Sequence, residues 1–294
     1  MPELPDITVY VERLADKVQG QVLRHVRVLN PFLLRTAVPP LAQAEGHRIV
    51  GVERLGKRVV LALENGFFLV IHLMVAGRLR WLLPGGKPPG KISLAVFEFE
   101  HGSMVLTEAG SKRRASLHVV ADRSALTAMD PGGIDVMTSD LANFTERLVL
   151  ENHTMKKVLT DPRLFSGIGN AYSDEILHRA QLSPLALSQK LPDEGVARLH
   201  SAIREVMTEW TDRLRQEAHD KFPENVTAFR PEMAVHGKFG KPCPVCQSPV
   251  QRIVYAENEC NYCARCQTGG KLLADRSLSR LLKESWPKSI DDLG

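Results

Sequence analysis

The sequence lacks the features that mark a chain for insertion into a membrane. No run of its 294 residues approaches the ~18 uninterrupted apolar residues of a membrane span. Its first residues are acidic, whereas a secretory signal peptide begins with a basic segment and an apolar run. It also has no internal repeat and no low-complexity tract. We therefore expect a globular intracellular protein with no membrane partner.

Cysteine is scarce, and all five cysteines fall between positions 243 and 266. Such clustering favours a metal site in a reducing compartment over a disulfide framework. Two C-x-x-C knuckles separated by sixteen residues can wrap four thiolates around one structural Zn²⁺, with a hairpin between them. The alternative is a set of buried cysteines without a metal. The predicted ligands are Cys243, Cys246, Cys263 and Cys266, while Cys260 lies outside the knuckle spacing.

Aromatic residues make up only 6% of the chain, but the apolar share of 44% is enough for sizeable cores. The length favours two domains, although one large domain is also possible. The net charge is +4 and the sequence pI is about 8.8. This mild basicity is compatible with a polyanionic partner and does not require one.

The chain opens MPELPD, and two interpretations of this start remain open. If Met1 is removed, Pro2 becomes the terminus and its nitrogen becomes a secondary amine. An α-amine has a pKa of about 8, well below that of lysine, so more of it is neutral and nucleophilic. Glu3 could then give or take protons. The alternative is an ordinary helix start, with Pro5 in the first turn and Asp6 favouring the helix dipole.

The spacing of apolar residues divides the chain into regions of different structure. Residues 5–18 have helical periodicity, and residues 23–120 contain short β-branched runs that predict an antiparallel sandwich or barrel. Residues 136–220 are helical in pattern, and residues 223–240 predict a linker and loop. The clearest helical pattern has one apolar face, formed by Val196, Leu199, Ile203, Val206, Trp210 and Leu214.

The tail after the cysteines carries a leucine stripe at helical spacing, formed by Leu278, Leu281 and Leu282. The stripe can pack on the protein's own surface or recruit a partner, and we favour packing.

The stretch FSGIGNAYSDEIL predicts a turn that leads into a helix. Gly167 and Gly169 precede Asn170, which opens a helix that runs through Ile176. Backbone N–H groups at such a start can hold a phosphate, and Asn170 can cap the helix or bind the same oxygen. The alternative is a simple tight turn. A Rossmann site fits poorly because the third glycine and the surrounding βαβ pattern are absent.

Two basic segments complete the candidate sites. Lys57 lies between a glycine turn and a strand, where its ammonium could reach into a cleft or remain a solvated flank. The run SKRRAS contains Arg113 and Arg114, which can contact phosphates or simply face water.

The chain contains, in this order, MPELPD, a G-K turn before a strand, H-L-x-x-x-G, G-x-G-N-x-Y and C-x₂-C-x₁₆-C-x₂-C. Together these motifs resemble the pattern of the formamidopyrimidine-DNA glycosylase / endonuclease VIII family. The resemblance covers about residues 1–268. It implies an α+β multidomain fold with an N-terminal β-sandwich, a helix-two-turn-helix domain and a zinc-ribbon hairpin. It also implies a base-excision DNA repair enzyme that is both a DNA glycosylase and an AP lyase.

The resemblance assigns a role to individual residues. Pro2 would attack C1′ of a flipped nucleotide, displace the base and form a Schiff base, while Glu3 would protonate the ring oxygen of the sugar. Lys57 would contact phosphate and assist β-elimination, and Asn170 would grip the DNA backbone. The other DNA contacts implied are His72, Arg113 and Arg114.

Four departures from the family pattern bear on the reaction and its specificity. Asn258 stands where the zinc hairpin usually carries an arginine credited with δ-elimination. Val75 replaces the methionine that plugs the gap left by the flipped base, with Met74 one residue early, and Ala115 replaces the aromatic wedge. The loop FPENVTAFRPEM is also short, which favours oxidised pyrimidines, ring-opened purines or abasic sites over 8-oxoguanine.

We therefore expect a monomeric enzyme in the cytoplasm or nucleoid that binds double-stranded DNA with a damaged base or abasic site and nicks it mainly by β-elimination. The alternative is a binder of distorted DNA that does not cleave it. The predicted segments are a catalytic domain over 1–135, a helix-two-turn-helix domain over 136–222, a linker and zinc hairpin over 223–268, and a helical tail over 269–294.

Overall fold

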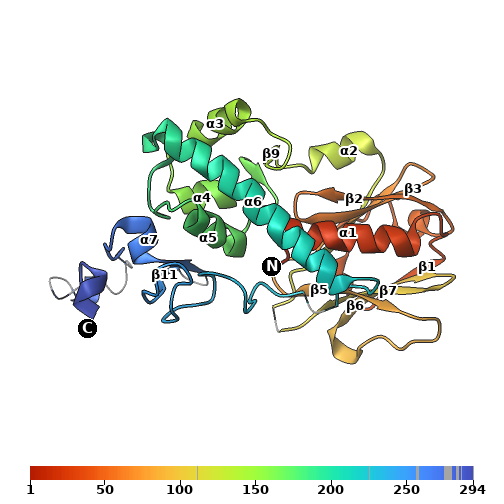
Figure 1. The fold of residues 1–294 in the computed structure, drawn as a ribbon. Helices are drawn as coiled ribbons and strands as arrows, with labels where there is room; N and C mark the ends of the chain where they lie inside the picture. The colour runs from red at the N-terminus through yellow and green to blue at the C-terminus, as the bar shows by residue number, and fades with distance from the viewer. Residues whose placement is uncertain are drawn as a thin grey trace. The chain divides into compact units, whose positions relative to one another are not determined.

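The computed structural model describes residues 1–110, 112–224, 226–255, 258–274, 280–282, 285 and 287–293. These residues form two compact units. The first comprises Met1–Pro131 and Trp210–Thr227, and the second comprises Gly132–Glu209 and Ala228–Gly294 (Figure 1). Among the described residues, no helix has both the length and the apolar character needed to cross a membrane.

The first unit is built on helix α1 and two four-stranded antiparallel sheets, which confirms the predicted sandwich. Helix α1 (Leu4–Val18) lies beside β2 (Figure 1). One sheet has the order β1 (His25–Val28), β6 (Ser93–Phe99), β7 (Gly102–Glu108) and β5 (Gly77–Leu82). The other has the order β2 (Ile49–Leu55), β3 (Arg58–Leu63), β4 (Phe68–His72) and β8 (Ser116–Val120). Short helices complete the unit: η1 (Pro31–Leu33), η2 (Leu41–Ala44), η3 (Gly90–Ile92) and α2 (Arg123–Ala128).

Strand β3 shows why one apolar run has no polar alternation. Val59 and Leu61 enter the main core, which also contains the buried face of α1. On the opposite face Val60 joins a smaller cluster with Leu126 of α2. Because both faces are covered, the strand is apolar at nearly every position.

The second unit is mainly helical. Its elements are β9 (Ile134–Asp135), α3 (Leu141–Val149), α4 (Met155–Thr160), β10 (Phe165–Ser166), α5 (Asn170–Arg179), η4 (Ser188–Lys190) and the first part of α6 (Asp193–Ala218). The rings of Phe144 on α3 and Phe165 on β10 lie 5.0 Å apart in its interior. Helix α6 buries the apolar face predicted from its sequence, and its last residues belong to the first unit.

The cysteine segment forms a hairpin of β11 (Gln251–Tyr255) and β12 (Asn258–Tyr262), followed by α7 (Ala264–Thr268). In the tail, Leu272 and Ile290 pack against this hairpin, and η6 spans Ile290–Leu293. The leucine stripe does not pack as expected, because Leu281 and Leu282 are 76% and 40% exposed. Leu278 lies outside the described residues.

Candidate functional site

The N-terminus is fixed by the start of α1. Glu3 is the N-cap and forms a capping box with Asp6, whose Oδ2 accepts the Glu3 backbone N–H at 2.9 Å. Pro5 occupies the first turn, where its missing N–H costs no hydrogen bond. Pro2 and Glu3 are both buried. The ordinary helix start is therefore present, and it places Pro2 immediately before a capped helix.

The surroundings of the terminal amine favour its neutral form. Burial is the main cause that lowers the pKa of the Met1 amine below its ordinary value. The charges of Arg78 and Lys57 lower it further, and those of Glu3 and Asp6 act in the opposite direction. The amine released by removal of Met1 is that of Pro2, one residue further along the chain. Burial and nearby cations thus favour a neutral, nucleophilic amine at this end of the protein.

Lys57 occupies the turn between β2 and β3, after Gly56 in the left-handed conformation. Burial lowers its pKa, and the charge of Glu3 opposes that shift. Lys57 is half-buried, which favours the cleft over a fully solvated flank. Lys57 belongs to the same electrostatic environment as Glu3 and the terminal amine.

His72 ends β4, in register with Arg58 on β3 and Ser116 on β8. Burial, followed by the charges of Arg58, Lys57 and His118, lowers its pKa to about 4. The imidazole is therefore neutral at neutral pH, and it can donate one hydrogen bond to a phosphate oxygen.

Arg113 and Arg114 lie in the exposed loop between β7 and β8. Glu108, which is buried, shapes this loop by accepting the backbone N–H groups of Arg114 and Ala115 at 3.0 Å. The Arg113 side chain donates to the Lys91 carbonyl at 2.5 Å. Sequence reasoning did not identify Glu108, because the partners of its carboxylate are backbone groups.

The HLMVAG segment forms a tight turn after β4. The Gly77 N–H donates to the Leu73 carbonyl at 2.9 Å, and a Cβ at Gly77 would lie only 2.1 Å from that oxygen. Met74 takes a positive φ of 53°, and Val75 is 60% exposed. This turn leaves the Val75 side chain largely exposed. Ala115, by contrast, is buried in the main core and cannot act as a wedge.

Arg78 ties this turn to a distant segment of the same unit, and the sequence did not reveal it. Its guanidinium donates to the Val75 carbonyl at 3.2 Å, to the Gly77 carbonyl at 2.7 Å and to the Val226 carbonyl. Arg78 also lowers the pKa of the terminal amine. The side chain therefore links the turn that carries Val75 with the electrostatics of the N-terminus.

In the second unit, Asn170 does not cap α5. Gly169 is the N-cap, Asn170 is the first helical residue, and the helix extends past the predicted end to Arg179. The Asn170 side chain donates to the Glu259 carbonyl of β12 at 2.9 Å. The sequence allowed a cap at this position, because asparagine favours it, but the Asn170 amide instead joins α5 to the cysteine hairpin.

Helix α5 contributes two carboxylates to a buried polar network. Asp174 accepts from Lys156 Nζ at 2.5 Å and pairs with His236 Nδ1 at 2.8 Å. Glu175 accepts the backbone N–H groups of Ala234, Val235 and His236 at 2.8–2.9 Å. The contacts with residues 234–236 join segments about sixty residues apart in the sequence, so no local sequence motif predicts them.

The four knuckle cysteines meet as predicted. Their Sγ atoms all lie within 4.8 Å of one another, with Cys243–Cys266 at 3.9 Å and Cys246–Cys263 at 3.3 Å. Zn–S bonds of about 2.3 Å in a tetrahedron place sulfurs about 3.8 Å apart, so four thiolates in this arrangement fit such an ion. Cys260 is buried outside the cluster.

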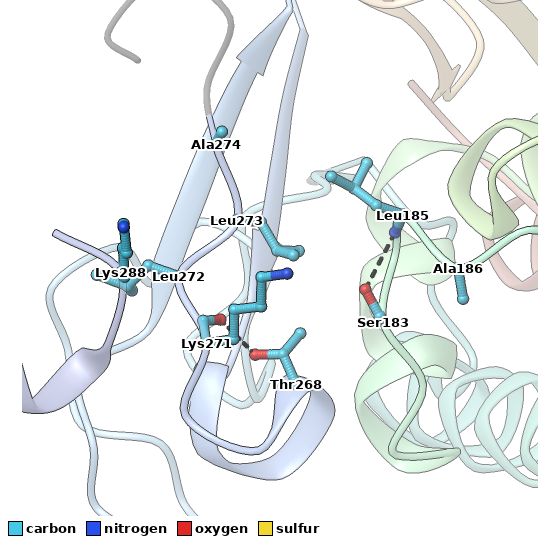
Figure 2. A pocket seen from close by; sticks show the side chains of 9 residues that line it. All are labelled: Ser183, Leu185, Ala186, Thr268, Lys271, Leu272, Leu273, Ala274 and Lys288. Atoms are coloured by element: carbon cyan, nitrogen blue, oxygen red, sulfur yellow. Dashed lines mark hydrogen bonds between the residues drawn. The ribbon is translucent and has the colours of Figure 1, made fainter. Parts of the chain in front are cut away.

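An open cavity of about 910 Å³ lies elsewhere in the second unit, between the segment after α5 and the chain after α7 (Figure 2). None of the predicted site residues lines it. Its lining residues are Ser183, Leu185, Ala186, Thr268, Lys271, Leu272, Leu273, Ala274 and Lys288.

Comparison with known proteins identifies the family. The Formamidopyrimidine-DNA glycosylase N-terminal domain matches residues 1–116, and the Formamidopyrimidine-DNA glycosylase H2TH domain matches residues 131–216. The formamidopyrimidine-DNA glycosylase of Thermus thermophilus is 33% identical over 278 residues, which cover 92% of this chain and 100% of the relative. An uncharacterized formamidopyrimidine-DNA glycosylase-like protein of Mycobacterium tuberculosis is 42% identical over 156 residues, which cover 53% of this chain and 95% of that protein.

Solved structures of proteins from this family have the same fold. The crystal structure of the MutM (Fpg) protein of Thermus thermophilus has a TM-score of 0.76 and 32% identity, and the match covers 90% of this chain and 98% of the other. The complex of Lactococcus lactis Fpg with DNA containing an abasic site shares the fold, with a TM-score of 0.80, 22% identity and coverage of 90% and 99%. The chain belongs to the formamidopyrimidine-DNA glycosylase family.

Proposed function

We propose that this protein is a bifunctional DNA glycosylase and AP lyase that acts through an imine formed by Pro2. Membership of the family establishes the reaction class. The observation that carries the assignment to Pro2 is its buried position before the capped start of α1, in surroundings that lower the pKa of the terminal amine. A protein that only binds DNA needs no such amine, so the alternative of a non-cleaving binder is not favoured.

The first half of the reaction replaces the damaged base with the protein. The lone pair of the Pro2 nitrogen attacks C1′, and the glycosidic bond breaks with its electron pair leaving on the base. The N–H proton of Pro2 passes to the departing base, so the nitrogen regains its lone pair. The carboxyl group of Glu3 gives a proton to the ring oxygen, the sugar opens, and a C1′ iminium forms. Burial of Glu3 keeps water away from this carboxyl group.

The second half breaks the DNA strand. Loss of a proton from C2′ sends electrons toward the iminium, and the 3′ C–O bond breaks with its electrons leaving on the phosphate. Lys57 assists this step, because its ammonium stabilises the phosphate that leaves. Since Asn258 brings no positive charge, we expect the reaction to stop mainly after β-elimination.

The second unit would hold DNA and one structural zinc ion. Cys243, Cys246, Cys263 and Cys266 supply four thiolates in the arrangement that Zn²⁺ prefers. Asn170, at the start of α5, would contact the DNA backbone, together with His72, Arg113 and Arg114 of the first unit. The expected substrates are oxidised pyrimidines, ring-opened purines or abasic sites in duplex DNA. We therefore expect the enzyme to work in the cytoplasm or nucleoid.

Borohydride trapping on duplex DNA with one abasic site tests this function. Wild-type protein should give a covalent adduct, and Pro2→Gly should give much less of it, because a primary amine replaces the secondary ring amine of proline. Pro84→Gly, in an exposed loop, is the matched control and should trap like the wild type. Equal trapping by Pro2→Gly and wild type would refute the mechanism.

A further inference from the structure

The cavity between the segment after α5 and the chain after α7 has an apolar floor. Leu185 and Leu273 are half-buried and pack against the core of the cysteine hairpin, in which Leu272 is buried. Ala186 and Ala274 add further apolar surface. Figure 2 shows the Leu273 side chain directed from the tail toward Leu185. The floor of the cavity is therefore a part of the hairpin core that a ligand can reach.

The hydroxyl groups of the wall already form hydrogen bonds within the protein. The Ser183 hydroxyl accepts the Leu185 N–H at 3.3 Å. The Thr268 hydroxyl lies 2.8 Å from the Ala264 carbonyl and 2.6 Å from the Lys271 carbonyl, to which it can donate. DNA phosphates are bound mainly by cations, hydroxyls and N–H groups. An apolar floor beside bonded hydroxyls is therefore a poor surface for DNA.

Two exposed lysines, Lys271 and Lys288, supply the charge of the cavity. The carboxylates of the last tail residues are engaged elsewhere, because Asp291 pairs with Arg265 at 2.5 Å and Asp292 accepts the Lys288 backbone N–H at 3.1 Å. Among the residues that the structure describes, no carboxylate lines the cavity, and neither lysine forms an ion pair. The site thus offers two cations and an apolar floor to a ligand.

The size of the cavity and the exposure of the nearby tail narrow the choice of ligand. A volume of about 910 Å³ lies near the top of the range of roughly 300–1,000 Å³ for ligand pockets, so a single ion would leave most of it empty. Leu281 and Leu282 are 76% and 40% exposed, so these leucines of the tail do not fill it. A peptide with apolar side chains and carboxylates would match both the floor and the charge.

We propose that this cavity is a docking site for an acidic peptide segment of a partner protein. Aliphatic or aromatic side chains of the segment enter between Leu185 and Leu273, and its carboxylates pair with Lys271 and Lys288. Both family matches end before residue 217, so the tail side of the site lies outside the matched segments. The inference concerns recruitment of the protein by a partner and does not depend on the chemistry of Pro2.

Fluorescence anisotropy with labelled pools of short peptides tests the site on the zinc-loaded full-length protein. In the first pool Leu, Ile, Phe and Trp are flanked by Asp and Glu. The second pool has Lys and Arg in place of the acids, and the third has Ser and Gln in place of the apolar residues. The first pool should bind at least about tenfold more tightly than either of the others. Equal binding of the three pools, or no binding of the first at about 1 mM protein, overturns the proposal.

Variants locate the binding in this cavity. Lys271→Gln/Lys288→Gln should bind the first pool about 2- to 30-fold more weakly, and added salt should weaken the wild type more than this variant. Leu273→Gln should lose about fivefold or more. The control Lys87→Gln/Lys190→Gln removes the same charge outside the cavity and should change affinity less than about twofold. Unchanged binding by the cavity variants, or an equal loss with the control, overturns the site.

Thermal unfolding separates docking from folding. If Leu273→Gln melts much lower than wild type, the variant without the two exposed lysines decides, and full affinity of that variant overturns the proposal. Two other occupants are scored in the same assay. An unmodified duplex that displaces the peptide, with an equal loss of DNA affinity in the lysine variant, assigns the cavity to DNA and overturns the proposal. Tighter peptide binding by Leu281→Ser/Leu282→Ser assigns the cavity to the protein's own tail and also overturns it.

Discussion

Glu3 and Asp6 secure each other at the start of α1, where the Glu3 N–H donates to Asp6 Oδ2 at 2.9 Å within a capping box. The contact fixes the backbone one residue after Pro2. A structural motif that is ordinary in helices thus positions the amine that the mechanism requires.

Removing the Asp6 side chain should show whether the capping box positions the terminal amine for its reaction or only stabilises the helix. Asp6→Ala removes the acceptor, so we expect a stability loss of about 1 kcal/mol and a roughly tenfold slower borohydride trapping rate. Asp6→Asn keeps an acceptor and should recover most of the rate. The pH profile of trapping should shift in Asp6→Ala, because Asp6 raises the pKa of the terminal amine. An Asp6→Ala variant with lower stability but an unchanged rate and pH profile would show that the box is only structural.

His72 should make the protein sensitive to mild acid. Its pKa is lowered to about 4, whereas an unfolded histidine titrates near 6.5, so the unfolded chain binds more protons between these values. Stability therefore falls as pH drops through this window, by about 2 kcal/mol between pH 7 and pH 5 from this group alone. Urea unfolding of wild type and His72→Gln at both pH values checks the difference. Identical losses in the two proteins would contradict the assignment.

His178 should strengthen zinc binding without being a ligand. Its Nε2 lies 3.3 Å from Cys243 Sγ, within hydrogen-bonding reach of the sulfur. Removing such an outer contact typically weakens metal binding about 10- to 100-fold, so His178→Ala should lose zinc to a chelator at correspondingly lower concentrations. Cys260→Ser should keep its zinc and Cys263→Ser should lose it. Retention of zinc by Cys263→Ser would refute the four-thiolate site.

Asn258 should determine how far strand cleavage proceeds. We expect wild type to leave mainly the unsaturated sugar fragment of β-elimination. Asn258→Arg introduces a positive charge at this position and should shift the products toward a 3′-phosphate end, whereas Asn258→Gln should not. Gel mobility of the cleaved strand resolves these products. Efficient double elimination by wild type would refute this interpretation of Asn258.

Features with local sequence patterns could be predicted. The apolar period of α1 located it within one residue at its start, since the expected 5–18 became Leu4–Val18. Paired knuckles identified the four cysteines because metal ligands recur at fixed spacing. The short β-branched runs over residues 23–120 similarly indicated the sandwich.

Features that depend on tertiary contacts could not be predicted. The partners of Arg78 and Glu175 include backbone groups about 148 and 60 residues away, and backbone acceptors and donors leave no trace in a sequence. A cap by Asn170 was one possibility left open by the sequence, but the Asn170 amide donates to a carbonyl of β12. The exposed Leu281 shows that helical spacing alone does not establish what a leucine packs against.

The central claim is that the Pro2 nitrogen forms the covalent bond to C1′. Tandem mass spectrometry of the borohydride-reduced adduct, after proteolysis and nuclease digestion, locates that bond directly. The account predicts a sugar fragment on the N-terminal peptide, at Pro2, with Met1 absent. A sugar fragment on the peptide that contains Lys57, or on an N-terminal peptide that still begins with Met1, would contradict it.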